Sequence, residues 1–177
     1  MMKKTVLVFS FLSISIFARC DVIFFPIQYT LLAYSAELIY SYEQAVKERS
    51  SNVLWGGAGC VGSFLAPEYP VVGFEFAYER RHYFKPGEYE HFFISGYLGT
   101  ALMTNFNDAC DIGIIPGFKI NYKARLAPKI ILEPYISVSI PISYSLKYTE
   151  MWAPFPVATV GIRLGFSNLK KDRKRPV

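Results

Sequence analysis

The sequence predicts an all-β protein, an eight-stranded antiparallel up-and-down transmembrane β-barrel that follows an N-terminal signal peptide. Three observations predict this fold class. Apolar and polar residues alternate with a period of two, clusters of turn residues recur roughly every ten to fifteen residues, and a short apolar leader precedes the first alternating segment. Of the 177 residues, 52% are hydrophobic and 17% aromatic, which excludes a disordered chain.

The leader has the shape of a secretory signal. Residues 1–4 are short and basic, and the apolar run Thr5–Ala18 follows them. This run is too short to span a bilayer comfortably as a helix, so we predict a signal peptide over residues 1–20. A buried N-terminal helix or strand is the alternative. Lipidation of Cys20 is a second alternative, but Arg19 opposes it because lipoprotein signals normally place a small residue before the cysteine.

The net charge lies at the two ends of the chain. The formal charge is +5, but the tail Lys170–Val177 carries five basic residues and one acidic residue. Without this tail and the basic residues of the leader, residues 20–169 have a net charge of about −2. A nucleic-acid-binding protein needs a basic folded surface, so that class of partner is excluded. We therefore predict one barrel domain at 21–167 and a solvated, basic periplasmic tail at 168–177.

Eight segments have the pattern of strands. Clusters of Pro, Gly, Asn, Asp, Ser or charged residues divide them, and Tyr34–Ser35 is the first divider. Pro134 and Pro141 lack the amide hydrogen that a central strand donates, so we expect bulges or local kinks there. The predicted strands are 22–32, 36–46, 52–64, 71–84, 90–103, 112–123, 130–145 and 156–166.

Each strand has one bulky apolar face and one face of small or charged residues. The first set includes Phe74, Phe76, Tyr78, Phe92, Leu98, Ile114, Phe118, Ile120, Ile136, Val138, Val160, Ile162, Leu164 and Phe166. The hairpin at Pro86–Gly87 tests the assignment, because a type II turn splays a two-residue hairpin. A loop with an odd number of residues places Phe76 beside Leu98 and keeps the two faces consistent.

Two arrangements satisfy this alternation. In a soluble lipocalin-like barrel the apolar face would fill the interior, but eight strands leave little room for so many aromatic rings. In a membrane barrel the apolar face contacts lipid and the small residues fit the lumen. Lys119 or Arg163 facing lipid would cost roughly 2–4 kcal/mol each, so we favour the second arrangement. Its interfacial aromatic belts are expected at Tyr83, Phe84, Tyr89, Tyr122, Tyr144, Tyr148, Trp152 and Phe166.

The charged residues of the small face are the candidate site. We predict a lumen ion-pair network of Glu75, Glu79, Lys119, Glu133 and Arg163, with Arg81 as a further member. Cys60 and Cys110 either form a disulfide or remain two buried thiols. No residues have metal-ligand spacing, and no cofactor is expected.

Catalysis is not predicted, and no catalytic residue is assigned. A lipid-modifying hydrolase or acyltransferase would need a nucleophile close to a histidine base and an acidic orienting group. The two histidines, His82 and His91, form no compact His-x-Ser arrangement. We interpret them as an interfacial pair at one end of the barrel.

With its signal peptide, eight alternating strands and final strand VATVGIRLGF, the mature chain resembles the small outer-membrane barrels of the OmpA/OmpX type. The resemblance implies a place in the bacterial outer membrane. It also implies recognition of the terminal aromatic, Phe166, by the barrel-insertion machinery. The chain departs from that family by adding SNLKKDRKRPV after Phe166.

Both termini are expected in the periplasm, with the longer loops at 66–70, 104–111 and 146–155 outside. The expected partners are outer-membrane lipid, the insertion machinery, and cell wall or an extracellular ligand through the loops. Because eight strands leave no aqueous channel, we expect a structural or surface-interaction role and no general pore. The alternatives are a lipid-modifying barrel enzyme and a soluble periplasmic lipid binder.

Overall fold

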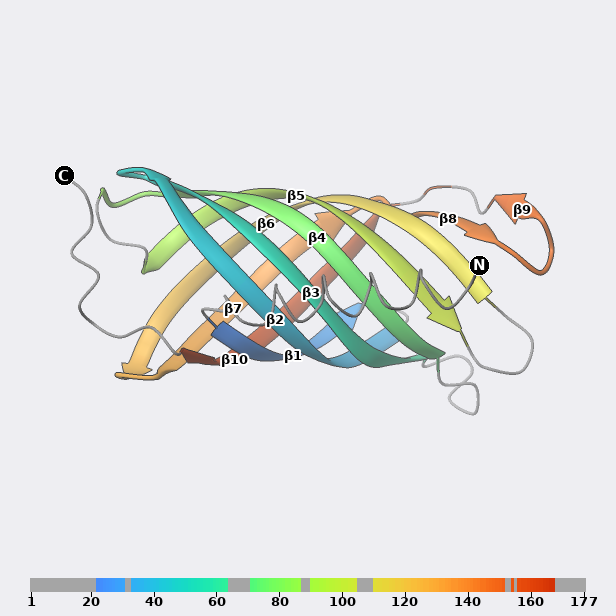
Figure 1. Ribbon diagram of the computed structural model, residues 1–177, viewed down its shortest axis with the longest axis horizontal. Coiled ribbons are helices and arrows are strands. Elements are labelled where there is room, and N and C mark those ends of the chain that lie inside the picture. The colour runs from blue at the N-terminus through green and yellow to red at the C-terminus, as the bar shows by residue number, and fades with distance from the viewer. Residues whose placement is uncertain are drawn as a thin grey trace, which may run out of the picture.

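The computed structural model describes residues 22–30, 33–63, 71–86, 90–104, 110–151, 154 and 156–167. They form a closed barrel of eight long antiparallel strands that tilt against the barrel axis (Figure 1). The strands are β1 (Val22–Thr30), β2 (Ala33–Lys47), β3 (Ser50–Ser63), β4 (Val71–Tyr83), β5 (His91–Thr104), β6 (Cys110–Ala127), β7 (Ile130–Ser139), β8 (Ile142–Ser145), β9 (Glu150–Met151) and β10 (Val157–Ser167). The predicted all-β barrel is confirmed.

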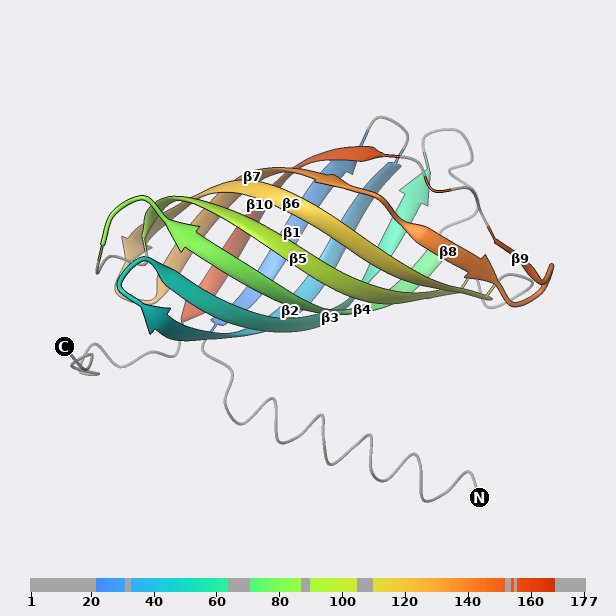
Figure 2. The ribbon, with the colours of Figure 1, turned by 90° about the horizontal axis from the view of Figure 1, so that it is seen from above.

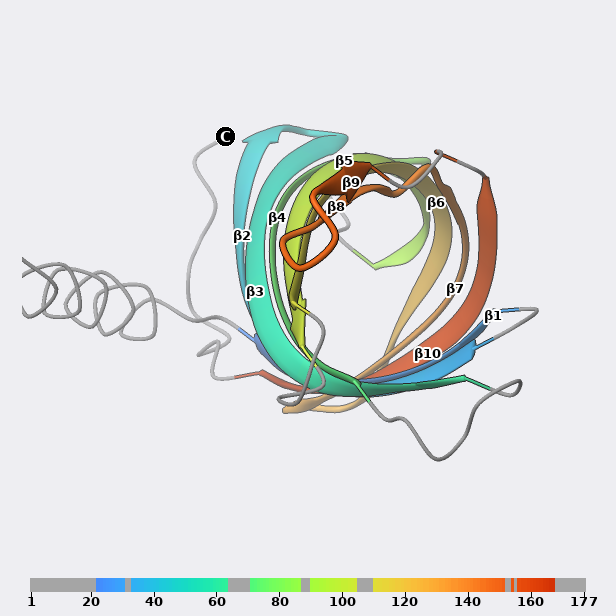
Figure 3. The same cartoon turned by 90° about the vertical axis from the view of Figure 1, so that its right-hand side faces the viewer.

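The barrel closes because β1 pairs with both β2 and β10, and every other long strand pairs with its neighbours in the chain. Figure 3 looks along the barrel from the end that bears β9 and shows the closed ring. Each of the eight long strands thus pairs with a neighbour on both sides, so none of these described strands is a sheet edge. In the described residues, no helix is long and apolar enough to cross a membrane. The predicted signal peptide at 1–20 and tail at 168–177 lie outside these residues.

The up-and-down order gives the barrel two different ends. We call the end with the β2–β3, β4–β5 and β6–β7 connections the turn end, and the opposite end the loop end. The short hairpin of β8 and β9 extends past the barrel at the loop end (Figure 2). The strand termini Val22 and Ser167 pair with one another at the turn end.

Strands β7 and β8 are two parts of one long strand that runs along β6. Gly117 pairs with Ser139 and Ile114 pairs with Ile142, so the register is the same on both sides of Pro141. The amide of Ile140 still donates a hydrogen bond to the carbonyl oxygen of Pro116 at 3.0 Å. The proline therefore interrupts the ladder locally and adds no residue to the strand.

Pro134 is tolerated in a similar way. It pairs with Ile162 on β10, while the β6–β7 pairing is interrupted between Asn121 and Ala124. The missing amide hydrogen explains the gap. The register shift between β6 and β7 lies further along, between Arg125 and Ala127. Of the bulges or local kinks expected at the prolines, a bulge is therefore not found at Pro134, where the ladder is interrupted instead.

The first predicted divider is also wrong. Tyr34 and Ser35 belong to β2, where Tyr34 pairs with Tyr29 and Ser35 with Gln28. Tyr34 is exposed on the outer face and Ser35 is buried on the inner face. These two residues thus continue the alternation of outward and inward side chains in β2. The Tyr-Ser pair does not form a turn.

The β4–β5 hairpin keeps the predicted faces but not the predicted partners. Phe76 pairs with Thr100 and Glu79 with Tyr97, two residues away from the predicted register. The difference arises at the turn end, where the amide of Phe84 donates to the carbonyl oxygen of Phe92 at 3.2 Å. The connection is therefore centred further along the chain than Pro86–Gly87. A shift of two residues preserves which face each side chain occupies.

The outer face of the barrel is apolar and the inner face is largely polar. Phe74 and Ile136 are 55% and 59% exposed, whereas Glu133 and Arg81 are 0% and 2% exposed. The bulky apolar side chains thus point outward. This is the orientation expected for the membrane arrangement, and it is the reverse of the one expected for a soluble barrel with an apolar interior. Other outward side chains are Phe76, Tyr78, Phe92, Leu98, Ile112, Ile114, Phe118, Ile120, Val138, Val160, Ile162, Leu164 and Phe166.

One aromatic residue of the predicted belts lies elsewhere. Tyr83 is completely buried in the lumen, where its ring lies 4.9 Å from that of Phe93. Its odd position on β4 places it on the same face as Glu79 and Arg81. Phe84, the next residue, points outward and is exposed. Tyr89 and Trp152 lie outside the described residues.

Candidate functional site: a charged plug and a cavity in the lumen

Buried charges fill the turn-end half of the lumen. We call this group the plug and define it as Glu43, Glu79, Arg81, Lys119, Lys123, Glu133 and Arg163. These residues come from β2, β4, β6, β7 and β10 and meet only because the ring is closed. Charges buried this deeply persist when each has a counter-charge.

Arg81 lies at the centre of the plug. Its guanidinium is 2.8 Å from Glu79, 3.5 Å from Glu43 and 3.5 Å from Glu133. It also lies 4.7 Å from the centre of the Phe93 ring. A planar group with five N–H donors can satisfy several carboxylates at once. Arg81 therefore links three strands that are not all neighbours.

Two further cations of the plug, Lys119 and Arg163, lie on its loop-end side. Lys119 Nζ lies 3.6 Å from Glu79 Oε2 and 4.3 Å from the centre of the Tyr97 ring. Arg163 Nη1 lies 3.1 Å from Glu133 Oε1, and its guanidinium lies 4.7 Å from the Tyr135 ring. Both cations are thus matched by a carboxylate and covered by aromatic rings.

Glu43 completes the plug nearest the turn end. Its carboxylate is 2.7 Å from Lys123 Nζ and accepts hydrogen bonds of 2.5 Å each from the hydroxyls of Ser51 and Tyr83. With Arg81 also at 3.5 Å, every side of this carboxylate has a donor. The plug has four cations and three carboxylates, so it has no surplus of negative charge.

The predicted network and the observed one overlap in part. Of the five predicted residues, Glu79, Lys119, Glu133 and Arg163 form ion pairs in the lumen. Glu75 forms no ion pair within the part of the chain that the structure describes. Arg81, predicted only as a further member, is the centre. Sequence reasoning missed Glu43 and Lys123, although both share the inward parity of their strands.

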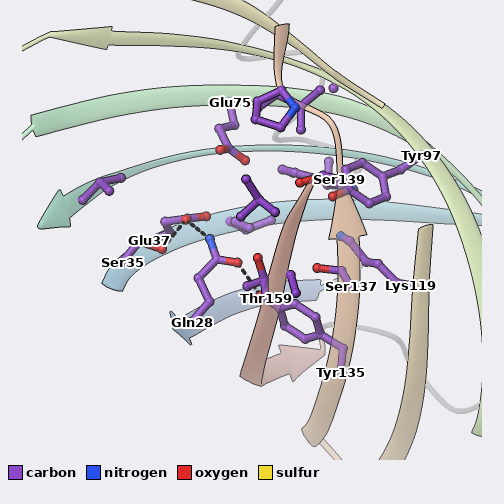
Figure 4. Close-up of a pocket in the computed structure, with 18 of the residues that line it drawn as sticks. Gln28, Ser35, Glu37, Glu75, Tyr97, Lys119, Tyr135, Ser137, Ser139 and Thr159 are labelled. Atoms are coloured by element: carbon purple, nitrogen blue, oxygen red, sulfur yellow. Dashed lines mark hydrogen bonds between the residues drawn. The ribbon is translucent and has the colours of Figure 1, made fainter. Parts of the chain in front are cut away.

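A cavity of about 610 Å³ occupies the loop-end half of the lumen, directly above the plug. Figure 4 shows most of the side chains that line it. Its walls include Ile39, Trp55, Val61, Tyr97, Met103 and Ile115, and its polar groups include Gln28, Ser35, Glu37, Glu75, Ser137, Ser139 and Thr159. Lys119 and Arg163 of the plug also line it, together with Tyr135. This volume lies within the range of ordinary small-molecule sites.

Glu37 is held in place by neutral donors. Its carboxylate accepts hydrogen bonds from Gln28 Nε2 and from the hydroxyl of Ser35, the second at 2.9 Å. Gln28 is itself fixed, because the Tyr135 hydroxyl donates to its Oε1 at 2.6 Å. No cation within the described ranges forms an ion pair with Glu37, and its hydrogen-bond partners there are neutral groups only.

The other predicted residues lie apart from this site. Cys60 and Cys110 are free thiols on β3 and β6, with β4 and β5 between them, so they do not form the considered disulfide. Strands are spaced about 4.8 Å apart, which puts the two cysteines beyond the 4.4–6.8 Å that a disulfide spans between Cα atoms. Cys60 is exposed and Cys110 is half-buried, so the interpretation as two buried thiols is also wrong.

The two histidines lie at the turn end, apart from the cavity. His82 is exposed on the outer face of β4, and His91 at the start of β5 has its ring 6.1 Å from that of Tyr122. Among the residues that the structure describes, no three His, Cys, Asp or Glu side chains gather as a metal site. Phe166 is exposed on the outer face of β10.

The fold and site together define a closed eight-stranded barrel with an apolar outer face, a charged plug and a cavity at one end. No family model matches the chain, and no curated protein matches it. Among solved structures, the S-type phycobiliprotein lyase CPES from Guillardia theta is similar over 86% of this chain and 89% of its own. The identity is 11% and the TM-score is 0.23, so this similarity carries no argument about function.

Proposed function

We propose that this protein is an outer-membrane β-barrel with a structural or surface-interaction role, and that the plug closes its lumen. The observation that carries the proposal is the orientation of the two faces. Bulky apolar side chains cover the outside of the strands, while the charged residues are buried within. This is the inside-out pattern of barrels that contact lipid.

An aqueous environment on all sides is hard to reconcile with the apolar outer face. Soluble monomers rarely expose continuous apolar patches larger than a few hundred Å². Here the neighbouring strands β6, β7 and β10 carry a group of apolar side chains that are each about half exposed. They are Phe118, Ile120, Ile136, Val138 and Val160. A lipid environment would cover this surface, and the closed ring would satisfy every strand's backbone hydrogen bonds there.

The plug supports a closed lumen. In the turn-end half, four large side chains are at most 2% exposed: Arg81, Tyr83, Phe93 and Ile131. Arg81 reaches from β4 to carboxylates on β2 and β7. Small barrels of eight strands have an interior just wide enough for side chains to fill. The proposed barrel therefore acts through its surface, its loops or its cavity, and not as a general pore.

The test is the location and folding behaviour of the protein in its native cell. We expect the protein in the outer-membrane fraction. On gels, the unheated, folded barrel should migrate at a different position from the heated, unfolded chain. Folded barrels in detergent commonly resist unfolding until heated. Recovery of the folded protein from the periplasm without detergent would contradict the proposal.

The cavity favours a second candidate, a soluble lipid binder of the periplasm. A volume of about 610 Å³ can hold a small ligand. However, the base of the cavity is formed by Lys119 and Arg163 beside buried carboxylates, and a lipid chain prefers an apolar base. The same fractionation separates the two candidates.

A further inference from the structure

The cavity above the plug has acidic side chains that no cation pairs with among the described residues. Its two cations, Lys119 and Arg163, already pair with Glu79 and Glu133 of the plug. Its two carboxylates, Glu37 and Glu75, have no ion-pair partner within the described residues. The wall of the cavity thus carries two acidic side chains that form no ion pair with the cations of the plug.

The two carboxylates lie on either side of a bare strip of backbone. On β3, Gly59 pairs with Glu37 of β2, and Gly57 pairs with Glu75 of β4. A Cβ atom on Gly59 would lie 2.3 Å from Glu37 Cγ, so the Glu37 side chain leans over this glycine. With β3 between them, the strands that carry the carboxylates are about 10 Å apart.

Both carboxylates face the open space. In Figure 4, Glu37 and Glu75 point into the cavity from β2 and β4. Glu37 cannot turn away freely, because Gln28 and Ser35 hold it. A buried carboxyl group without a counter-charge tends to take up a proton, and a positive group beside it stabilises the ionised form instead. The geometry leaves room for a positive group between the two carboxylates.

The remaining wall is suited to an apolar body. Trp55, Tyr97, Met103 and Ile115 line the same cavity. Aromatic faces attract organic cations as well as apolar groups. A bare metal ion is a poorer fit, because hard cations such as calcium take six to eight oxygen ligands. No three acidic, histidine or cysteine side chains gather in the part of the chain that is described.

We propose that this cavity binds a compact organic cation, an amine or guanidine on an apolar body, with its charge between Glu37 and Glu75. The apolar body lies against Trp55 and Tyr97. This inference concerns the interior of the barrel and holds whether or not lipid surrounds it. Failure of the binding test and failure of the fractionation test are therefore distinguishable.

The experiment compares three probes of one shape in the purified, folded full chain. They are 4-fluorobenzylamine, 4-fluorobenzyl alcohol and 4-fluorobenzoate, which are cationic, neutral and anionic at pH 7. Fluorine NMR titration measures the dissociation constant of each. We expect the amine to bind at least about tenfold more tightly than the alcohol, and the benzoate to bind most weakly, because charge-assisted hydrogen bonds exceed neutral ones.

Matched variants locate the effect. In the Glu37→Gln/Glu75→Gln double variant, which preserves side-chain shape, the preference for the amine should disappear. Glu90→Gln is the control, because Glu90 pairs with Arg125 at the turn end, away from the cavity. Circular dichroism checks folding. If the double variant does not fold, Glu75→Gln alone, which breaks no ion pair, must still weaken amine binding severalfold.

Several outcomes overturn the proposal. One is equal binding of the amine and the alcohol. Another is an amine preference that survives in Glu75→Gln and in the double variant. Tighter binding of benzoate would instead assign the cavity to anions through Lys119 and Arg163. Displacement of the amine by micromolar calcium chloride would assign it to a metal ion.

Discussion

Arg163 and Glu133 occupy directly paired positions on β10 and β7, and Arg163 Nη1 lies 3.1 Å from Glu133 Oε1 inside the barrel. Glu133 also lies 3.5 Å from Arg81, so one carboxylate balances two buried guanidinium groups. Both residues of the pair are almost completely buried. The pair therefore joins the closing strand to the centre of the plug.

Replacing Glu133 by glutamine should destabilise the barrel strongly. The change leaves Arg163 and Arg81 buried with fewer counter-charges, and breaking a buried pair in this way costs about 3–5 kcal/mol. Denaturant unfolding in detergent measures the free energy of unfolding. Glu90→Gln is the control, because the exposed Glu90–Arg125 pair should contribute less than about 1 kcal/mol. Equal stabilities of the two variants would contradict the role of the plug.

Gly59→Ala should destabilise the barrel by about 1–3 kcal/mol. A Cβ atom there would lie 2.6 Å from the carbonyl oxygen of Ala36 and 2.9 Å from Glu37 Cα, and backbone atoms cannot move aside cheaply. Gly96→Ala is the matched control, since no heavy atom lies within 4 Å of its Cβ position. The same unfolding assay compares them. A Gly59→Ala barrel as stable as Gly96→Ala would show that β2 and β3 are less closely packed.

The outer face can be tested by a single charge. Ile136 is 59% exposed near the middle of β7, and Ile136→Lys in a lipid bilayer should cost about 2–4 kcal/mol. Leu146→Lys is the control, because Leu146 lies beyond β8 at the loop end, where the cost should fall to about 0–1 kcal/mol. Folding equilibria in lipid vesicles give both values. If Ile136→Lys left the folding free energy unchanged, this result would argue that water, and not lipid, surrounds the barrel.

The plug should keep the lumen closed to solutes. Vesicles that contain the wild-type barrel should not swell in arabinose, because Arg81 and its partners fill the turn-end half of the lumen. An open porin reconstituted in parallel provides the positive control. Rapid swelling with the wild-type barrel would mean that the plug moves aside.

Reducing agents should leave the barrel unchanged. Cys60 and Cys110 are free thiols on strands that are not neighbours. Unfolding midpoints with and without dithiothreitol should therefore agree. A lower midpoint in dithiothreitol would reveal a disulfide.

The alternation of the sequence determined which side chains share a face. Because strand side chains alternate with a period of exactly two positions, the local pattern alone places Glu79, Lys119 and Glu133 on one face and Phe76 and Ile136 on the other. Errors of two residues, such as the β4–β5 register, leave this assignment intact. The eight strands and their approximate bounds follow from the same pattern and its turn residues.

The tertiary structure alone decided which charges meet. The contacts of Arg81 with Glu43 and Glu133 join strands that are not neighbours in the ring. These contacts depend on the stagger between strands of the closed barrel. The alternation of residues along a strand assigns each side chain to a face but does not determine this stagger. The same stagger leaves Glu75 at the cavity instead of in the plug. Local pattern thus determined the faces of this protein, and ring closure determined its plug and its cavity, because only closure fixes height along the barrel axis.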